Sequence, residues 1–386
     1  MNGPGTPLTI SETPGPFDSR ARVVALDALR GIAVAGIALM NVYIYALPPA
    51  AYFNPAAAGS EGALDWVVWG LSFVFIEDKF RSLFAMLFGA GVAILLGRAR
   101  DSGDGHPIRN HVFRMLVLFA IGAAHAILLA NNDVLRLYAM AGLFVPLFLK
   151  LSSRRLLIAG GALMAIHALA GSIIAYQWLT ATPGSALALL PAQIFGNDPV
   201  ALDYAQAVGI ESFGERLPRR IYGFGAALET QIPGIPSALG TMLVGAGLWR
   251  NGLLKGEWSR ARCFALARNM ALIALPPLAA LMVLDWWAGF PGAMVGPVAL
   301  FWSLPFDLLL GVGYAALAMG FFADRDSALR RVLAAAGRLS LTNYLLSSLI
   351  FAALFYSWGL GLFGTMPRSG AFALAFVPIV SMMIWS

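Results

Sequence analysis

Long uninterrupted runs of apolar residues alternate with short polar stretches along the whole chain. Six of these runs approach or exceed the roughly 20 residues with which an α-helix crosses a bilayer. They are Ile32–Leu47, Val112–Ala130, Leu156–Trp178, Met270–Trp287, Ala293–Phe322 and Leu341–Trp358. None resembles the weak alternation of apolar and polar residues in a membrane β-barrel. The pattern predicts an all-α protein, built as a polytopic bundle of transmembrane helices.

Weaker apolar stretches bring the expected number of spans to about ten, with one re-entrant or interfacial segment near 63–77. The expected spans are 31–47, 82–97, 113–130, 134–149, 156–179, 232–249, 269–288, 294–322, 340–358 and 370–386. Pro233 and Pro236 stand at the start of the sixth span and are expected to break a helix there. Broken helices at membrane depth usually line a cavity.

Four parts of the chain follow from this pattern. They are a disordered tail (1–22), an N-terminal membrane bundle (23–180), an extracytoplasmic loop with an amphipathic segment (181–231) and a C-terminal membrane bundle (232–386). The tail lacks the basic and apolar regions of a secretory signal. The last expected span ends at Ser386 without a basic tail, which is the pattern of a shortened C-terminus.

Composition and charge agree with a membrane setting. Hydrophobic residues make up 59% of the chain and charged residues 12%, and the mean hydropathy is +0.75. Soluble domains carry about 25% charged residues. The net charge of +6 does not indicate a nucleic-acid partner, because the basic residues lie in short loops. The single cysteine excludes an intrachain disulfide.

The basic residues predict the orientation. They gather in four clusters, at 98–114, 150–155, 250–268 and 325–338, and near the first span at 20–30. Basic loops remain in the cytoplasm. The N-terminus and these clusters are therefore expected inside, with the other connections outside.

A first group of polar residues is expected at the inner face. Asp27 and Arg30 are spaced i, i+3 at the start of the first span, on one helix face. They form either an ion pair that anchors the helix end or a basic group that receives a phosphate-bearing donor. Asn343, at the start of the ninth span, either bonds a neighbouring helix or contacts substrate.

A second group is expected at the outer face. Its members are Glu77, Asp78, Lys79, Arg81, His125, Asp133 and Arg136. His125 lies well inside the third span and Asp133 just beyond it. A neutral His acts as a general base, and a nearby carboxylate would orient it. The alternative is a structural histidine bonded to a neighbouring helix, which is also our interpretation of His167.

Two further carboxylates support a different hypothesis. Asp307 is expected near the middle of the eighth span, where an ionisable residue indicates a functional site. Together with Glu229 it could couple protons to the transport of a small solute. No inverted repeat is detectable, which weakens this hypothesis slightly.

Several stretches resemble the YeiB family of bacterial membrane proteins. They are VVALDALRGIAVAGIALMNV, EDKFRSLFAMLFGAG, GAAHAILLANNDVLRLYAMAGL, LGTMLVGAGLWRNGLL and GRLSLTNYLLSSLI followed by GLGLFG. The resemblance extends from about Val23 to Gly364 and implies a bacterial cytoplasmic (inner) membrane protein with a C-terminal domain of unknown function. The family usually continues into a short motif with Gly-Pro and Glu-Trp, which this chain lacks.

The family is distantly similar to transmembrane acyltransferases, including heparan-alpha-glucosaminide N-acetyltransferase. That likeness implies acyl-CoA as a co-substrate. It also implies that the donor enters near Arg30 and that the acceptor binds at the outer group of residues. The acetyltransferase has its catalytic histidine in the outer segment after the first span. Here that segment contains no histidine, so His125 is a candidate in its own right.

The leading hypothesis is an acyltransferase-like protein acting on an envelope glycan or a lipid headgroup. His125 would be the base, Asp133 its orienter and Glu77 a further catalytic group, with no bound cofactor and no metal. Substrate contacts are expected from Asp27, Arg30, Lys79, Arg81, Arg136 and Asn343. The alternatives are a solute transporter or exporter and a membrane partner without turnover. In each case the lipid bilayer surrounds the protein.

Overall fold

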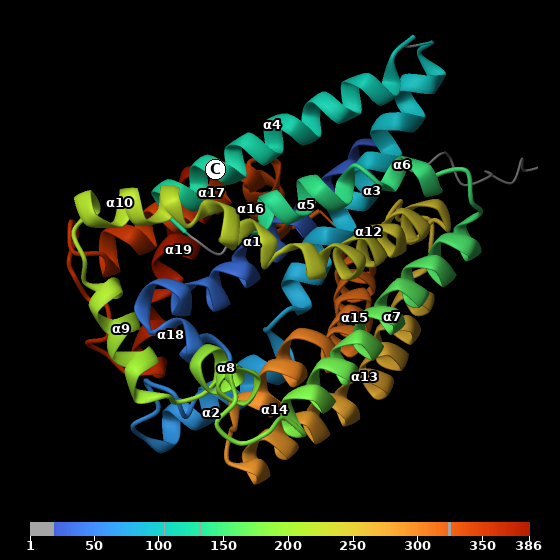
Figure 1. Ribbon diagram of the computed structural model, residues 1–386. Helices are drawn as coiled ribbons and strands as arrows, with labels where there is room; N and C mark the ends of the chain where they lie inside the picture. Colours follow the sequence, from blue (N-terminus) through green and yellow to red (C-terminus); the bar gives the residue numbers. More distant parts are fainter. Residues whose placement is uncertain (1–18, 104, 131–132, 323–325) are drawn as a thin grey trace, which may run out of the picture.

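The protein is all helical in the part that the computed structural model describes, residues 19–103, 105–130, 133–322 and 326–386 (Figure 1). Most of the expected N-terminal tail lies outside these residues. The N-terminal half contains α1 Ser19–Ala46, η1 Pro49–Tyr52, α2 Ala63–Phe75, α3 Lys79–Asp101, α4 Pro107–Leu128, α5 Val134–Gly142, α6 Val145–Phe148 and α7 Ser153–Leu179. Short helices follow, α8 Ala186–Phe195, α9 Pro199–Gly209, α10 Phe213–Tyr222, α11 Phe224–Glu229 and η2 Ile232–Gly234. The C-terminal half contains α12 Ile235–Arg250, α13 Arg260–Ala288, α14 Gly292–Pro297, the π-helix η3 Val298–Trp302, α15 Leu304–Phe322, α16 Ala328–Arg338, α17 Ser340–Phe355, α18 Arg368–Leu374 and α19 Phe376–Trp385.

Eight helices of the described chain are long and apolar enough to cross a membrane, or nine if α16 and α17 count as one span bent by 83°. This is fewer than the ten expected. The expected span 134–149 is divided into α5 and α6, which are nine and four residues long. Pro146 stands at the start of α6, and its missing N–H cannot continue the ladder of α5.

The expected span 294–322 is also interrupted. Pro297 ends α14, one π-helical turn follows as η3, and α15 begins only at Leu304. Asp307 therefore lies in the first turn of α15 rather than at the middle of a span. The break before α12 occurs where the prolines predicted it, at η2.

Close glycine contacts hold the centre of the bundle together. Helix α12 packs between α3 and α7. A Cβ added at Gly245 of α12 would lie 1.8 Å from the carbonyl oxygen of Met86 in α3, and one at Gly89 would lie 2.0 Å from that of Met242. Small residues let membrane helices approach this closely, which maximises van der Waals contact without a hydrophobic driving force.

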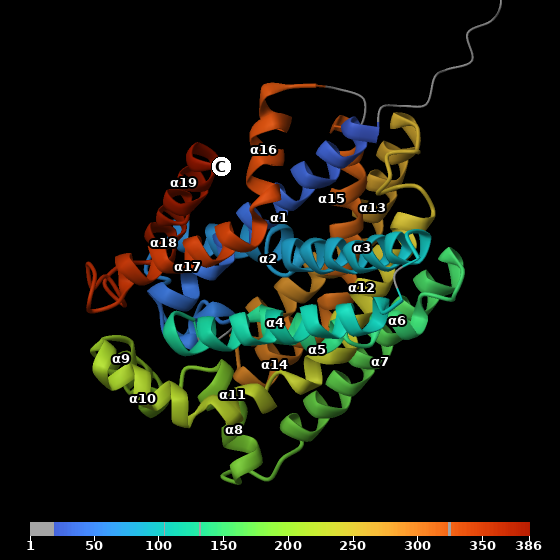
Figure 2. The ribbon, with the colours of Figure 1, turned by 90° about the horizontal axis from the view of Figure 1, so that it is seen from above.

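A second close contact joins the two ends of the chain. Helix α1 packs along α16 through Gly31, whose added Cβ would meet the carbonyl oxygen of Leu333 at 2.1 Å. Gly337 approaches the carbonyl of Asp27 in the same way, at 1.7 Å. The bend after α16 then directs the start of α17 into the bundle (Figure 2).

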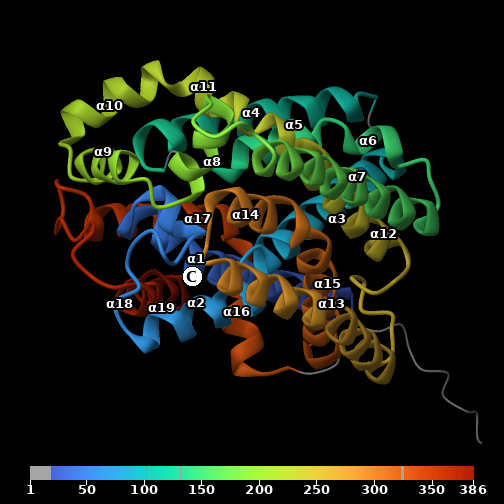
Figure 3. The same ribbon diagram turned by 60° about the horizontal axis from the view of Figure 1, so that its bottom comes forward.

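The two ends of the bundle differ in charge. The turns α3–α4, α6–α7 and α12–α13, which carry three of the predicted basic clusters, lie together at the right of Figures 2 and 3. The short helices α8–α10 lie at the other end. Between these ends, α4, α7 and α13 expose apolar side chains such as Phe113, Ile166 and Leu272 to the outside. This arrangement fits a bilayer around the bundle.

Candidate active site

A cavity of about 200 Å³ lies where the broken helices meet. Its walls come from α1, α3, α5, α7, the α11–α12 connection, η3, α15 and α17. The polar and aromatic lining residues are Asn41, Tyr52, Asp78, Phe80, Arg81, Asp133, His167, Thr230, Gln231, Ser237, Phe301 and Tyr344. A mostly apolar cavity with a few convergent polar groups is the usual form of a ligand site.

His125 and Asp133 form a buried dyad beside this cavity. Helix α4 ends just after His125, and the ring Nδ1 lies 2.8 Å from Asp133 Oδ1. Asp133 is the N-cap of α5, and its Oδ2 accepts the backbone N–H of Arg136 at 3.0 Å. An Asp in this position satisfies an otherwise unpaired donor of the helix. Both carboxylate oxygens are thereby committed, and the one facing His125 can only accept.

The second ring nitrogen of His125 has no partner in the described part of the chain, and the ring lies beside the cavity residues Asp133 and Tyr344 without lining the cavity itself. Because Nδ1 donates to Asp133, the neutral ring carries its lone pair on Nε2. This atom is buried and has no hydrogen-bond partner among the described residues. The ring of Tyr344, which lines the cavity, lies 5.2 Å from the ring of His125, and its hydroxyl lies 3.5 Å from Asp133 Oδ1. The dyad thus has the composition of an oriented general base.

The dyad is held from two further directions. Gly122, one turn before His125, leaves room for the carboxylate, since an added Cβ would lie 2.5 Å from Asp133 Oδ2. The side chain of Gln231 donates to the carbonyl oxygen of Asp133 at 2.6 Å. The break before α12 therefore contacts the residue that orients the base.

An ion pair also lines the cavity. Asp78 adopts the left-handed conformation, with φ of 56°, at the break between α2 and α3. Its carboxylate lies 2.8 Å from the guanidinium of Arg81, and both residues line the cavity. A non-glycine residue with positive φ costs roughly 1–3 kcal/mol. The strain places a charged pair on the cavity wall.

Lys79 does not line the cavity but forms a second, fully buried ion pair with Asp307. Its ammonium lies 2.6 Å from Asp307 Oδ1 and also donates to the carbonyl of Phe73. Glu77 is buried as well, and neither it nor Lys79 lines the cavity. The charged knot expected at 77–81 is thus divided, with Asp78 and Arg81 facing the cavity.

The structure separates the remaining predicted residues from the cavity. Asp27 and Arg30 form the expected ion pair at 2.8 Å, near the start of α1. Asn343 is fully buried and bonds Ala336 O, Ser386 Oγ and Trp385 Nε1. Glu229 is exposed at the end of α11. Arg136 is buried behind Asp133, with its Nε 3.8 Å from Oδ2.

Several cavity residues escaped the sequence reasoning. Tyr344 directly follows Asn343, for which the inner face was expected, yet in the structure it lies beside the dyad, after the 83° bend that precedes α17. His167, interpreted as structural, does bond the carbonyl of Leu300 at 3.0 Å, yet it also lines the cavity. Thr230 and Gln231 directly precede the predicted helix break. That position was the one signal that could have identified them.

The described residues contain no group of three His, Cys, Asp or Glu that could hold a metal ion. The cavity is also smaller than the roughly 300–1,000 Å³ typical of sites for drug-sized ligands.

Comparisons with known proteins identify relatives over most of the chain. A family model described as a protein of unknown function (DUF418) matches residues 248–386. YeiB of Escherichia coli strain K12 is 33% identical over 360 residues, which cover 88% of this chain and 85% of that protein. YxaH of Bacillus subtilis strain 168 is 24% identical over 388 residues, covering 95% and 90%. Both are described as uncharacterized proteins, and no solved structure matches the chain.

Proposed function

The chain belongs to the YeiB family, and on that premise we propose that it is a membrane-bound acyltransferase. It would move an acyl group from cytoplasmic acyl-CoA to an envelope glycan or lipid acceptor. The observation that carries the proposal is the His125–Asp133 dyad, with a buried and unpartnered Nε2 beside a cavity of headgroup size.

The chemistry follows from the protonation of the dyad. Nε2 of His125 takes the proton from a hydroxyl or amine of the acceptor as that group attacks the thioester carbonyl. A new ester or amide bond forms, the C–S bond breaks, and the CoA thiolate leaves with the proton returned by His125. Asp133 holds the ring and stabilises the imidazolium between these two steps. Arg81, which is partly exposed and lines the cavity, would position the acceptor.

The donor would approach from the basic end of the bundle. Arg30 lies on α1, six residues before Gly36, the first residue of that helix to line the cavity. Six residues of α-helix correspond to about 9 Å. The CoA phosphates would stay near Arg30 and the neighbouring basic turns, while the acyl thioester reaches the cavity. We expect that end to lie in the cytoplasm, because basic loops usually remain inside.

Labelled acyl-CoA and purified protein in lipid nanodiscs test this proposal. We expect transfer of label to a hydroxyl or amine acceptor, with the rate lowered about 10²–10⁴-fold in His125→Gln. His111→Gln is the matched control, because His111 is also a buried histidine of α4 but bonds Gly142 O away from the cavity. Equal rates in the two variants would remove His125 from the mechanism.

A transporter remains the second candidate, and one observation favours it. The Lys79–Asp307 pair is fully buried at the break between α2 and α3, and ionisable pairs at membrane depth often serve proton coupling. The other proposed coupling residue, Glu229, is exposed and does not line the cavity. This candidate predicts proton-linked solute flux in liposomes that disappears with Asp307→Asn, without acyl transfer.

A further inference from the structure

Helix α10 has its polar and apolar faces in unusual positions. Its arginines at 216 and 220 are buried against the bundle, whereas Ile221 and Tyr222 are exposed, Tyr222 by 89%. A helix on the surface of a soluble protein shows the opposite arrangement, with charge outward. The outward face of α10 is therefore adapted to an apolar environment.

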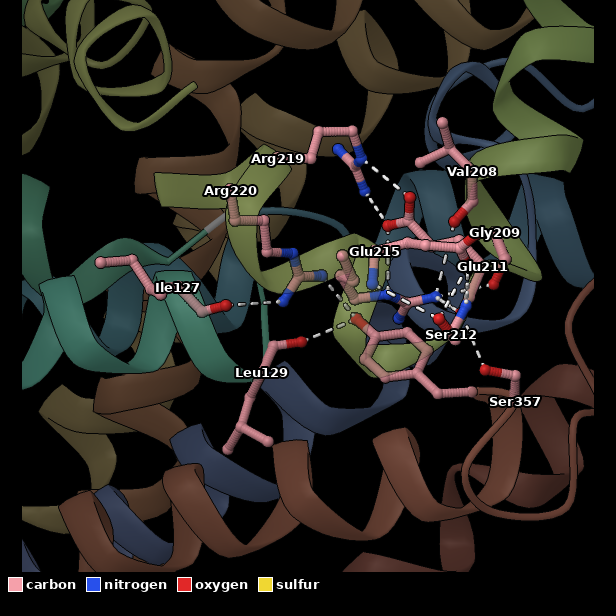
Figure 4. Close-up of polar contacts among 12 residues, drawn as sticks. Ile127, Leu129, Val208, Gly209, Glu211, Ser212, Glu215, Arg219, Arg220 and Ser357 are labelled. Carbon is pink, nitrogen blue, oxygen red and sulfur yellow. Dashed lines mark hydrogen bonds and ion pairs between the residues drawn. The ribbon is translucent and has the colours of Figure 1, made fainter. Parts of the chain in front are cut away.

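The buried arginines donate to helix ends. Arg216 donates to Gly209 O at 2.8 Å, at the last residue of α9, pairs with Glu211 at 3.4 Å, and stacks its guanidinium 3.6 Å from the ring centroid of Tyr356. Arg220 donates to the Tyr356 hydroxyl at 3.0 Å and to Ile127 O at the end of α4 (Figure 4). Cations at helix C-termini are favoured by the helix dipole. The inward charge is thus structural and fixes α10 on the bundle.

One edge of the same helix stays polar. Glu215 is exposed and forms a capping box with Ser212 at the start of α10. Hydrogen bonds from Ser212 lower the pKa of Glu215, so this carboxylate is ionised at neutral pH. Burial lowers the pKa of Arg216. An apolar face bordered by an ionised edge is the pattern of a helix that lies in a membrane interface.

The neighbouring segments continue this apolar surface toward the cavity. Exposed apolar side chains also occur on α9 and beyond α11, among them Val200, Tyr204 and Ile232. Eight residues separate Tyr222 from Thr230, which is roughly 12 Å of helix, and Thr230 lines the cavity. Tyrosine is enriched at lipid–water interfaces. The exposed surface of α9–α11 thus continues along the chain to Thr230, which lines the cavity.

We propose that α9–α11 lie in the lipid–water interface and that the acceptor is a membrane-borne amphiphile, whose headgroup enters the cavity past Thr230 and Gln231. The partner of this surface is lipid, because α10 packs on α4, a span that exposes apolar side chains such as Phe113 and Leu128. The identity of the acceptor rests on the proposed acyl-transfer function. The location of the surface does not depend on it.

Spin labels in liposomes test the surface independently of activity. Single cysteines replace Tyr222, Ile166 or Ser102 in a Cys263→Ala background; Ile166 is exposed on the apolar helix α7, and Ser102 is exposed in the basic turn. We expect the label at 222 to resemble that at 166, accessible to oxygen and protected from a water-soluble nickel complex. The proposal would be overturned if the label at 222 were as accessible to the nickel complex as the label at 102. It would also be overturned if the label at 222 were protected from nickel only in the presence of a protein partner.

Two acceptors that share one headgroup test the substrate class. Dodecyl glucoside is membrane-borne and methyl glucoside is water-soluble. We expect wild type to acylate the first at least tenfold faster, and Tyr222→Asp to reduce that preference while leaving the methyl glucoside rate unchanged. Equal wild-type rates for the two would refute a membrane-borne acceptor. If neither is acylated, the acyl-transfer function fails together with this acceptor, whereas the spin labels still decide the surface.

Discussion

Asp133→Asn is a small change that should reverse the proton arrangement of the dyad. In the wild type, Oδ2 accepts the backbone N–H of Arg136 at 3.0 Å, and Oδ1 faces His125 Nδ1 at 2.8 Å. An asparagine has one oxygen, and the capping bond claims it. Its amide NH₂ then points at Nδ1, which must accept, so the ring proton moves to Nε2. The lone pair that would act as base is lost.

The expected size of the effect follows from that reversal. Loss of a positioned general base costs about 10²–10⁴-fold in rate, and an Asp→Asn change that inverts a histidine tautomer in a hydrolase triad costs about 10⁴-fold. The cap itself survives, because Asn and Asp cap helices about equally well. Arg136 loses an anionic neighbour 3.8 Å away, so some loss of thermal stability should accompany the rate effect.

Two measurements separate these effects. Thermal unfolding of each variant in detergent first gives its folded fraction. The rate of label transfer is then divided by the amount of folded protein. ¹⁵N NMR of histidine-labelled protein then reports which ring nitrogen of His125 carries the proton. Asp198→Asn is the matched control, since Asp198 also caps a helix through its side chain, at 2.9 Å from the N–H of Ala201, and lies outside the cavity.

The reasoning would be refuted by either of two results. Transfer within threefold of wild type in Asp133→Asn would show that the dyad does not set the rate. A ¹⁵N spectrum with the proton still on Nδ1 would show that the capping bond does not fix the amide. Loss of activity in Asp198→Asn as well would indicate a general folding effect instead.

The remaining predictions concern stability. Removing one partner of the buried Lys79–Asp307 pair, as in Lys79→Ala, should destabilise the protein by about 3–5 kcal/mol, whereas the double variant Lys79→Met with Asp307→Leu should recover most of this loss. Equal thermal unfolding of the wild type and these two variants would contradict a buried ion pair. Gly245→Ala should prevent the close packing of α12 on α3, because the added Cβ would lie 1.8 Å from Met86 O. Gly97→Ala is the control: no atom lies within 4 Å of its added Cβ, so this change should be neutral or stabilise the protein by about 0.5–1 kcal/mol. Yield and thermal stability after purification measure both, and a well-folded Gly245→Ala protein would show that α3 and α12 can separate.

Hydrophobic length predicted the long spans well. The expected 156–179 and 269–288 correspond to α7 Ser153–Leu179 and α13 Arg260–Ala288. It failed where a run of suitable length contains local breaks, as in 134–149. Hydropathy averages over a window, so it does not register the turn and the proline that separate α5 from α6.

The candidate site was predictable only in its local part. His125 and Asp133 are eight residues apart, and helical geometry alone suggested that they meet. The contact between Lys79 and Asp307 joins residues 228 positions apart, and nothing in either local sequence indicates it. Tyr344 reaches the dyad through a bend between two helices, which periodicity cannot reveal.

The proposal depends most on His125 acting as the base for transfer of an acyl group that is supplied from the basic end of the bundle. Proteoliposomes of known orientation, given labelled acyl-CoA only on the side of the α3–α4 turn, test it most directly. The account predicts label on an acceptor in the opposite leaflet, at a rate at least about 100-fold lower in His125→Gln. No label in the wild type, or equal label in both proteins, would contradict it.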